Sequence, residues 1–518
     1  MTQEPEALLN TTATKREVRG STLFLVGRVL LVGLNFVTQV LIVRYLSKAD
    51  YGAFAYALVV AMNVESIITL GLDRVDKQFM ATYDEQRDYP RLAGTIALVL
   101  GSVVSLGLAA ALLLYGLQDW LSESVITEKD VVPILVILIL LAPIQAVDNL
   151  TMSLFGVFAR PRAVFFRRYV LNPCLRLAVV ILLIAAESGV TFLAVGYVAT
   201  GVIGVLLYGT MLVRLLRGKR LLGYFRPRHI KVPFRKVFGY ALPLTTTDLG
   251  AVLSQTLGVF LIGLYYGTPE VAALRAIVPT AHLNLLVIRS FTFLYAPNAA
   301  REVVRGARAS IRDLYWQTAI WIAVFSFPIF AVTFALAEPL TVALFGERYR
   351  DSAPLLALLA LGYFISSACG FNGVTLQVFG KVRFLVVTNL AASAVNVILF
   401  LLLIPAYGAL GAAISMSATL IFHNVLKQAG LRVHTGVEIF QRRYLRVYLV
   451  VIASALCLWL IQLTLEPPIV LGLALAGLAS ALLLAVSHNL LRIADTFPEL
   501  RRIPFARRLF PAPAPGGA

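Results

Sequence analysis

The sequence predicts an all-α integral membrane protein with about fourteen transmembrane helices, arranged as two six-helix lobes followed by two C-terminal helices. Of its 518 residues, 59% are apolar and only 14% are charged. The mean hydropathy of +0.83 is too high for a soluble domain, which must cover its core with polar groups. Apolar runs of about 20 residues recur along the chain, and lipid leaves their backbone groups unpaired unless each run is a helix.

Each of these apolar runs is long enough to cross about 30 Å of hydrocarbon at a rise of about 1.5 Å per residue. Gly189 and the segment 405–408 supply tight turns between closely spaced runs. The predicted spans are 21–45, 52–71, 93–117, 131–158, 165–186, 190–213, 237–265, 271–297, 315–337, 352–379, 384–405, 409–430, 444–464 and 468–491.

The distribution of Lys and Arg predicts the orientation of the chain. With the N-terminus inside, the cytoplasmic segments hold 36 of the 45 Lys and Arg residues and the outer loops hold five. This asymmetry follows the positive-inside rule. It predicts a multi-pass protein of the cell (cytoplasmic or inner) membrane with both termini in the cytoplasm and the acidic loop 118–130 outside. The net charge of +18 therefore reflects membrane topology rather than nucleic-acid binding, and the basic loop 214–236 is expected to contact anionic lipid.

An internal repeat with an offset of roughly 220 residues relates the two lobes. The turn 158–162 (FARPR) corresponds to 379–383 (FGKVR), and 50–52 corresponds to 267–269. Six helices per half is an even number, so both halves enter from the same side, as in alternating-access transporters with parallel repeats. The predicted parts are a cytoplasmic N-terminal segment 1–20, an N-lobe 21–213, a basic cytoplasmic linker 214–236, a C-lobe 237–430, two further helices 444–491 and a cytoplasmic tail 492–518.

The segment 46–54 reads LSKADYGAF, follows Asn35-Phe36 and Leu41 in the first span, and is completed by Ala55-Tyr56. This segment and the FGKVR turn resemble those of polysaccharide-biosynthesis flippases, the Wzx-type branch of the multidrug/oligosaccharidyl-lipid/polysaccharide exporter superfamily. With the repeat and the two extra helices, the resemblance covers nearly the whole chain. It implies a V-shaped fold of two lobes and transport of a polyprenyl-linked oligosaccharide, on an undecaprenyl- or dolichyl-type carrier, from the cytoplasmic to the outer face.

Charged side chains inside a span cost at least about 2.5–3.5 kcal/mol on insertion scales, so each needs a function or a partner. Arg275, His282 and Arg289 are seven residues apart, which keeps them on one helix face with a drift of about 20° per step. Such a stripe suits a pyrophosphate-linked sugar, because guanidinium binds phosphate bidentately. The alternative is that both arginines extend to opposite interfaces and His282 hydrogen-bonds a neighbouring helix.

Arg28 and Asp248 differ by the repeat offset and lie at equivalent positions on the helices that open the two lobes. They are expected to pair in one transport state and to bind substrate in another, or else to form a permanent ion pair. Lipid II flippases contact their headgroup with an arginine on helix 1 and another on helix 8. The resemblance makes Arg28 and Arg275 their counterparts by position.

Arg176 and Asp148 lie on neighbouring predicted helices of the N-lobe and could form an ion pair, although Arg176 is also a candidate substrate-binding residue. Glu65 and Asp148 are weaker candidates for ion coupling. Asn389 and Asn396 repeat at seven residues and are expected to join helices by hydrogen bonds.

The predicted function is the flipping of a lipid-linked oligosaccharide, without catalytic residues, metal or cofactor. A drug/cation antiporter of the same superfamily is the first alternative, but five basic groups in the spans against three acids favour an anionic substrate. A membrane glycosyltransferase or polymerase is the second alternative, and the chain has no Asp-x-Asp motif. The expected partners are the lipid-linked substrate, membrane lipids and a glycan polymerase or glycosyltransferases, with the chain itself a monomer.

Overall fold

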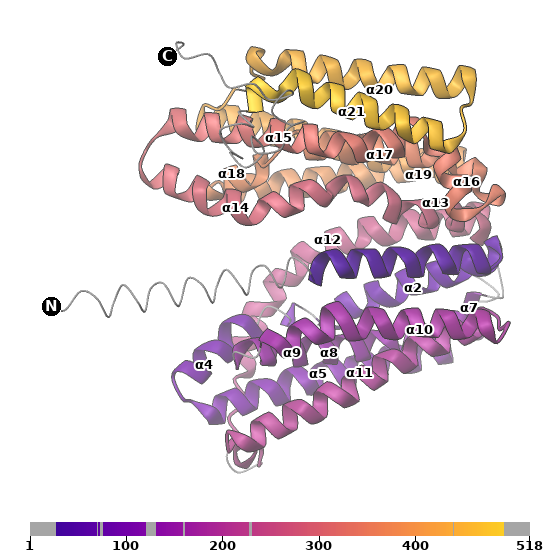
Figure 1. Cartoon of the computed structure of the whole chain (residues 1–518). Helices are drawn as coiled ribbons and strands as arrows, with labels where there is room; N and C mark the ends of the chain where they lie inside the picture. Colours follow the sequence, from indigo (N-terminus) through magenta and orange to yellow (C-terminus); the bar gives the residue numbers. More distant parts are fainter. Residues whose placement is uncertain are drawn as a thin grey trace. The chain divides into compact units, whose positions relative to one another are not determined.

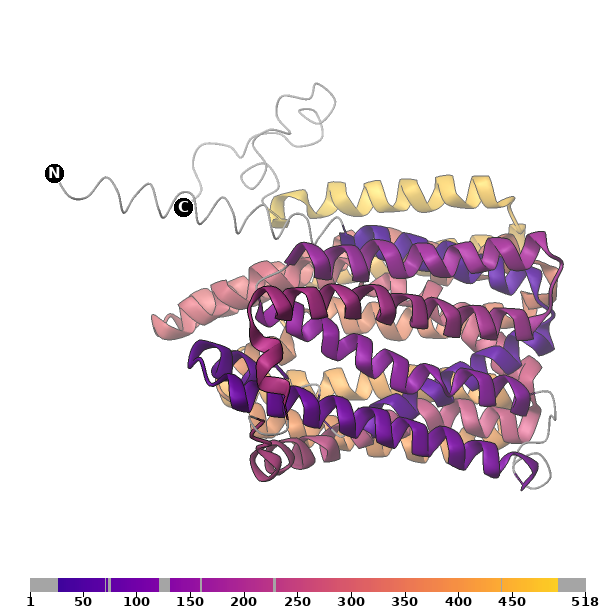
Figure 2. The ribbon, with the colours of Figure 1, turned by 90° about the horizontal axis from the view of Figure 1, so that it is seen from below.

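The computed structural model is helical throughout the residues it describes, without a strand among them (Figure 1). These residues are 27–69, 71–72, 76–120, 131–158, 161–226, 230–438 and 440–491, with the side chains of 76–77, 161, 242–255, 293, 308 and 489–490 excepted. The predicted segment 1–20, most of the loop 118–130 and the tail 492–518 lie outside this range. The chain divides into two compact units, 1–272 and 273–518, and long helices run roughly parallel within them (Figure 2).

The first unit is built from long apolar helices around a core that includes Leu72, Met80 and Leu154. Helix α2 is one of its two most buried long helical stretches, with Ala and Gly at many of the buried positions, which lets neighbouring helices approach closely. In chain order the helices are Gly27–Tyr45, α2 (Lys48–Thr69), α4 (Ala81–Glu85), α5 (Tyr89–Gly116), α7 (Val131–Leu138), α8 (Leu141–Val157), α9 (Pro161–Phe165), the π-helix η2 (Phe166–Leu171), α10 (Asn172–Ala185), α11 (Val190–Gly218) and α12 (Phe234–Tyr266).

The second unit has a more aromatic core, in which Tyr315, Phe327 and Phe330 of α15 are buried. Helix α15 packs against α17, α20 and α21. In chain order the helices are α13 (Thr268–Ala281), which begins in the first unit, the 3₁₀ turn η4 (His282–Leu285), α14 (Leu286–Val304), α15 (Arg308–Ala335), α16 (Ala337–Phe345), α17 (Ala353–Ala368), α18 (Asn372–Val378), α19 (Val382–Thr435), α20 (Leu445–Leu465) and α21 (Ile469–Leu491).

The described residues contain twelve helices that are long and apolar enough to cross a membrane. One of them, α19, combines the predicted spans 384–405 and 409–430 across a kink at Gly408, where φ is 56° and ψ is −133°. Helix α12 coincides with the predicted span 237–265, although the side chains in its middle are outside the described set. The prediction of an all-α, multi-pass membrane protein is confirmed. The predicted number of about fourteen spans is close to the twelve helices found in the described residues, because α19 contains two predicted spans and α12 corresponds to one more.

The two halves of α19 form a hairpin held by polar contacts and close backbone approach. Asn389 Oδ1 lies 2.8 Å from His423 Nε2, and Asn396 donates to Thr419 Oγ1 at 3.1 Å. A Cβ at Gly411 would overlap the carbonyl of Leu403, so only glycine lets the two backbones meet there. The prediction that the two asparagines join helices is confirmed.

The predicted span 271–297 is not one continuous helix, and this corrects the expected geometry of the cationic stripe. The turn η4 separates α13 from α14 and starts at His282. Hydrogen bonds of Asn284 hold the turn η4 in place. The Asn284 side chain donates to the carbonyl of Ala281 and to Thr333 Oγ1, while Ser367 Oγ donates to the carbonyl of Asn284. Since a 3₁₀ turn rotates about 20° more per residue than an α-helix, the four residues of η4 shift the face after His282 by about 80°.

The turn around residue 51 and the turn around residue 268, counterparts under the predicted repeat, lie against each other. A Cβ on Gly52 would overlap the backbone carbonyl of Thr268, and α12 packs along α2. The repeat and the division into lobes at 214–236 stay predictions.

Candidate functional site: charged residues within the helices

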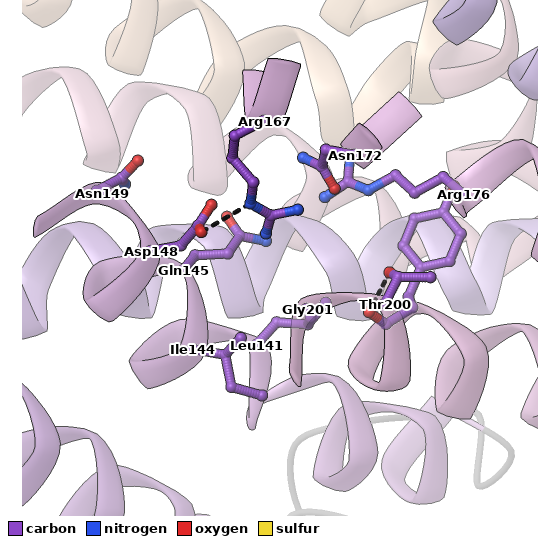
Figure 3. Close-up of a pocket in the computed structure, with 11 residues that line it drawn as sticks. Leu141, Ile144, Gln145, Asp148, Asn149, Arg167, Asn172, Arg176, Thr200 and Gly201 are labelled. Carbon is purple, nitrogen blue, oxygen red and sulfur yellow. Dashed lines mark hydrogen bonds and ion pairs between the residues drawn. The ribbon is translucent and has the colours of Figure 1, made fainter. Parts of the chain in front are cut away.

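A small polar cavity lies inside the first unit, between α8, the segment from η2 to α10, and α11 (Figure 3). Its volume is about 110 Å³. Three charged side chains face it from two segments, and neutral polar groups together with a few apolar residues complete the wall. The lining residues are Leu141, Ile144, Gln145, Asp148, Asn149, Arg167, Asn172, Arg176, Tyr197, Thr200 and Gly201.

Arg167 is the most deeply buried charge in the described part of the chain, with 2% of its surface exposed. Its Nε donates to Asp148 Oδ1 at 2.9 Å, and the Asp148 side chain is 18% exposed. The guanidinium also lies 5.7 Å from the ring centroid of Tyr208. It fits against α11 because position 204 is glycine, and a Cβ there would overlap it. A charge this far from water persists only when it is paired.

The expected ion pair between Arg176 and Asp148 is wrong, since Asp148 pairs with Arg167. Arg176 instead places its guanidinium 5.1 Å from the ring centroid of Tyr197. Sequence reasoning misses Arg167 because its position in the chain groups it with the basic cytoplasmic segment that starts at residue 160. Helix α9 begins at Pro161, so Arg167 lies about 9 Å inside the helical segment.

The π-helix η2 explains how Arg167 and Arg176 come to line one cavity. In an uninterrupted α-helix, residues nine apart point in directions about 180° apart. A π-turn absorbs one additional residue, so the separation becomes that of eight residues, or about 80°. Helix η2 spans Phe166–Leu171, with Arg167 as its second residue and Arg176 beyond its end, and supplies this change. Such interruptions often occur at functional positions.

Glu65, the other candidate for ion coupling, lies beside this cavity. Its Oε1 accepts a hydrogen bond from Asn149 Nδ2 at 3.1 Å, and Asn149 follows Asp148 in the chain. Glu65 of α2 therefore contacts the residue of α8 that follows Asp148, the other acid named for ion coupling. Whether they bind or release an ion stays a prediction.

In the second unit, His282 is hydrogen-bonded to a neighbouring helix. Its Nε2 lies 2.8 Å from the hydroxyl of Tyr363 on α17, and the two rings meet edge to face with centroids 4.7 Å apart. Arg275 and Arg289 lie within electrostatic range of both rings, so the three predicted residues and Tyr363 form one electrostatic cluster. Tyr363 was not predicted, because nothing in the sequence distinguishes it from the other tyrosines of the spans.

The exposure of the three stripe residues differs along the segment. Arg275 and His282 are half-buried and Arg289 is exposed. The hydrogen bond of His282 agrees with the interpretation that this residue joins two helices. The electrostatic influence of the two arginines agrees with the interpretation of a cationic cluster. Neither finding tests substrate binding.

Arg28 and Asp248 both belong to the first unit. Arg28 is half-buried on the helix Gly27–Tyr45. The backbone of residue 248 lies within α12, but the side chain of Asp248 is outside the described set, so their pairing stays a prediction. Among the residues that the structure describes, no group of three or more His, Cys, Asp or Glu could hold a metal ion.

Comparison with known proteins places this fold among membrane transporters. The profile of a family described as "Polysaccharide biosynthesis protein" matches residues 18–300. The solved structure of the lipid II flippase MurJ in an inward closed conformation superposes with a TM-score of 0.67 at 12% identity, covering 91% of this chain and 99% of MurJ.

An inward-facing multidrug resistance MATE family transporter of the MOP superfamily gives a TM-score of 0.63 at 14% identity, covering 78% of this chain and 94% of its own. The MATE multidrug transporter DinF-BH gives a TM-score of 0.56 at 13% identity, covering 80% of this chain and 94% of its own. At these identities the likeness establishes the fold alone. No curated protein matches the sequence.

Proposed function

Because the chain belongs to the polysaccharide biosynthesis protein family, we propose that it moves a polyprenyl-phosphate-linked oligosaccharide from the cytoplasmic to the outer face of the membrane by alternating access. The fold is shared with flippases and with drug transporters, so fold alone does not select the substrate. The observation that carries the proposal is the placement of arginines within apolar helices of a chain from this family.

The cluster around Tyr363 is the proposed contact for the phosphate groups. Arg275 and Arg289 lie close enough to His282 for their charges to act on it, although their segment is interrupted by η4. Two guanidinium groups offer bidentate hydrogen bonds to the two phosphates of a pyrophosphate. The 3₁₀ turn provides a point at which the segment can bend between transport states.

The remaining predicted residues receive roles on the same basis. Arg28, Arg176 and Asp248 are proposed to contact the headgroup or to exchange partners during transport, and Glu65 and Asp148 to couple transport to an ion. We propose that the protein lies in the cell (inner) membrane with both termini in the cytoplasm, because this orientation puts most Lys and Arg inside. It would act as a monomeric transporter rather than an enzyme, beside the glycosyltransferases and polymerase that make and use its substrate.

A drug/cation antiporter is the second candidate function, and the fold shared with MATE transporters favours it. Such a transporter would use acids within the helices to bind protons or cations. Glu65 and Asp148 are candidates, since Glu65 accepts a hydrogen bond from Asn149, the residue after Asp148. The two functions differ in the charge of the cargo, which makes them separable by experiment.

The test uses purified protein reconstituted into liposomes. The cargo is a short-chain polyprenyl diphosphate that carries a fluorescent sugar, and dithionite added outside reports the fraction that has crossed. Wild-type protein should accelerate the crossing, Arg275→Glu should abolish the acceleration, and Arg217→Gln, an exposed cation at the end of α11, should not affect it. Export of a cationic dye on an imposed proton gradient, without movement of the polyprenyl diphosphate, would establish the antiporter instead.

A further inference from the structure

Two buried guanidinium nitrogens in the first unit have no hydrogen-bond partner among the described residues. They are Arg167 Nη1 and Arg176 Nε. Both arginines line the cavity of about 110 Å³ (Figure 3). One water needs about 10–15 Å³ of such volume, so the cavity has room for a small ligand with part of its hydration shell. A buried donor that lacks an acceptor is costly, and two of them on one cavity point to a missing acceptor.

The two guanidinium groups are held in position, so they cannot easily turn away to find other acceptors. Arg167 is fixed through its Nε to Asp148 and against α11 at Gly204. Arg176 is fixed over the ring of Tyr197. Figure 3 shows the two side chains extending toward each other, with Asn172 beside them. Preorganised donors of this kind bind a ligand without a large cost of ordering.

The charge balance of the cavity selects the ligand. Its lining has two cations, Arg167 and Arg176, and one anion, Asp148, which leaves a formal charge of +1. Glu65 lies outside the lining and accepts a hydrogen bond from Asn149. Two like charges that face one cavity repel each other in a medium of low dielectric constant. One monovalent anion between them would neutralise the lining and accept both hydrogen bonds.

We propose that this cavity binds one small monovalent anionic group between Arg167 Nη1 and Arg176 Nε. Free chloride has this chemistry, and so does one singly charged phosphoryl group of a polyprenyl diphosphate. Bound there, the anion would link α8, α10 and α11 and stabilise their packing. The inference rests on the geometry of the cavity, and only its phosphoryl form depends on the proposed function.

The experiment measures binding of radiolabelled chloride to the full-length protein in detergent, without any lipid substrate. Saturable binding with one chloride per chain is expected. Arg176→Gln should weaken it roughly tenfold to a hundredfold, the equivalent of one hydrogen bond to a charged group. Arg176→Lys keeps the charge, so its chloride affinity should lie between those of the wild type and Arg176→Gln. Arg217→Gln should bind chloride as tightly as the wild type.

Asp148→Asn gives the result that most sharply separates an anion site from a cation site. It raises the formal charge of the lining to +2, so chloride should bind more tightly, whereas a cation site would lose its ligand. Since this variant leaves Arg167 without its partner, size-exclusion chromatography must first show that it is folded. The Arg176 variants, which leave that ion pair intact, provide the same test independently.

A second arm repeats the measurement with unlabelled polyprenyl diphosphate as competitor. Displacement of chloride in the wild type would identify the phosphoryl group as the natural occupant, and undisturbed chloride binding would identify the free ion. The inference is overturned if wild-type protein binds neither probe in a manner that depends on Arg176, or if folded Asp148→Asn binds chloride less tightly. Because flipping is not measured, these outcomes are independent of those that test the proposed function.

Discussion

Replacement of Gly204 by alanine should destabilise the first unit although it adds only one methyl group. The new Cβ would overlap the guanidinium of Arg167, which is held by a 2.9 Å contact with Asp148. Breaking a buried ion pair costs about 3–5 kcal/mol, because both charges are left without compensation. Alanine favours a helix over glycine by about 1 kcal/mol. The expected net loss in free energy of unfolding is therefore about 2–4 kcal/mol.

The measurement is thermal or denaturant-induced unfolding of purified protein in detergent, compared with Gly209→Ala. Gly209 is on the same helix, and a Cβ there would meet no atom within 4 Å, so this control should be neutral or slightly stabilising. In an Asp148→Asn background the cost of Gly204→Ala should shrink, since the ion pair is already lost. If Gly204→Ala behaves like Gly209→Ala, the Arg167 guanidinium can move without losing its partner, and the reasoning about its confinement is refuted.

Three further outcomes are expected. Gly411→Ala should reduce the yield of folded protein strongly, because its Cβ would strike the backbone of the other half of α19, whereas Gly477→Ala faces open space and should be silent; equal yields would contradict this. A reporter fused after Ala518 should be active only in the cytoplasm, and activity outside the cell would reverse the orientation taken from the Lys and Arg distribution. In complementation of surface-glycan assembly, Arg275→Lys should retain part of the function, Arg275→Ala little and Arg275→Glu least, because lysine keeps the charge but loses the bidentate fork. Normal glycan with Arg275→Glu at normal abundance would exclude this residue from phosphate binding.

The helices could be predicted because their cause is local. A run of about 20 apolar residues has one stable form in lipid, whatever surrounds it. The kink at Gly408 and the joining role of Asn389 and Asn396 were also within reach, since turn residues and amides within apolar spans have few other uses. These features depend on the residues themselves and on the solvent.

The charged sites were predicted less well, because their geometry depends on where the helical hydrogen-bond pattern slips. An uninterrupted α-helix would place Arg275, His282 and Arg289 on one face, but η4 changes the direction of the side chains after His282. It would also place Arg167 and Arg176 on opposite faces, but η2 brings them to one cavity. A proline lies next to each interruption, Pro279 before η4 and Pro173 after η2, and weakens the helical hydrogen-bond pattern there. The proline does not set the new direction of the helix face, because distant partners such as Thr333 and Ser367 stabilise η4.

Both interruptions occur where a charged or titratable side chain must be accommodated inside the membrane, and this coincidence has a physical reason. A continuous α-helix offers only fixed directions at steps of about 100°, so a buried charge can reach its partner only if the partner lies in one of them. A single π or 3₁₀ turn adds new directions at the cost of a few poorer hydrogen bonds. For Arg167 that cost is offset by the ion pair with Asp148, since an unpaired charge at this depth would cost several kcal/mol. The ion pair with Asp148 therefore offsets the cost of η2, and Pro173 at the start of α10 also favours the interruption, because it has no N–H to complete the α-helical pattern.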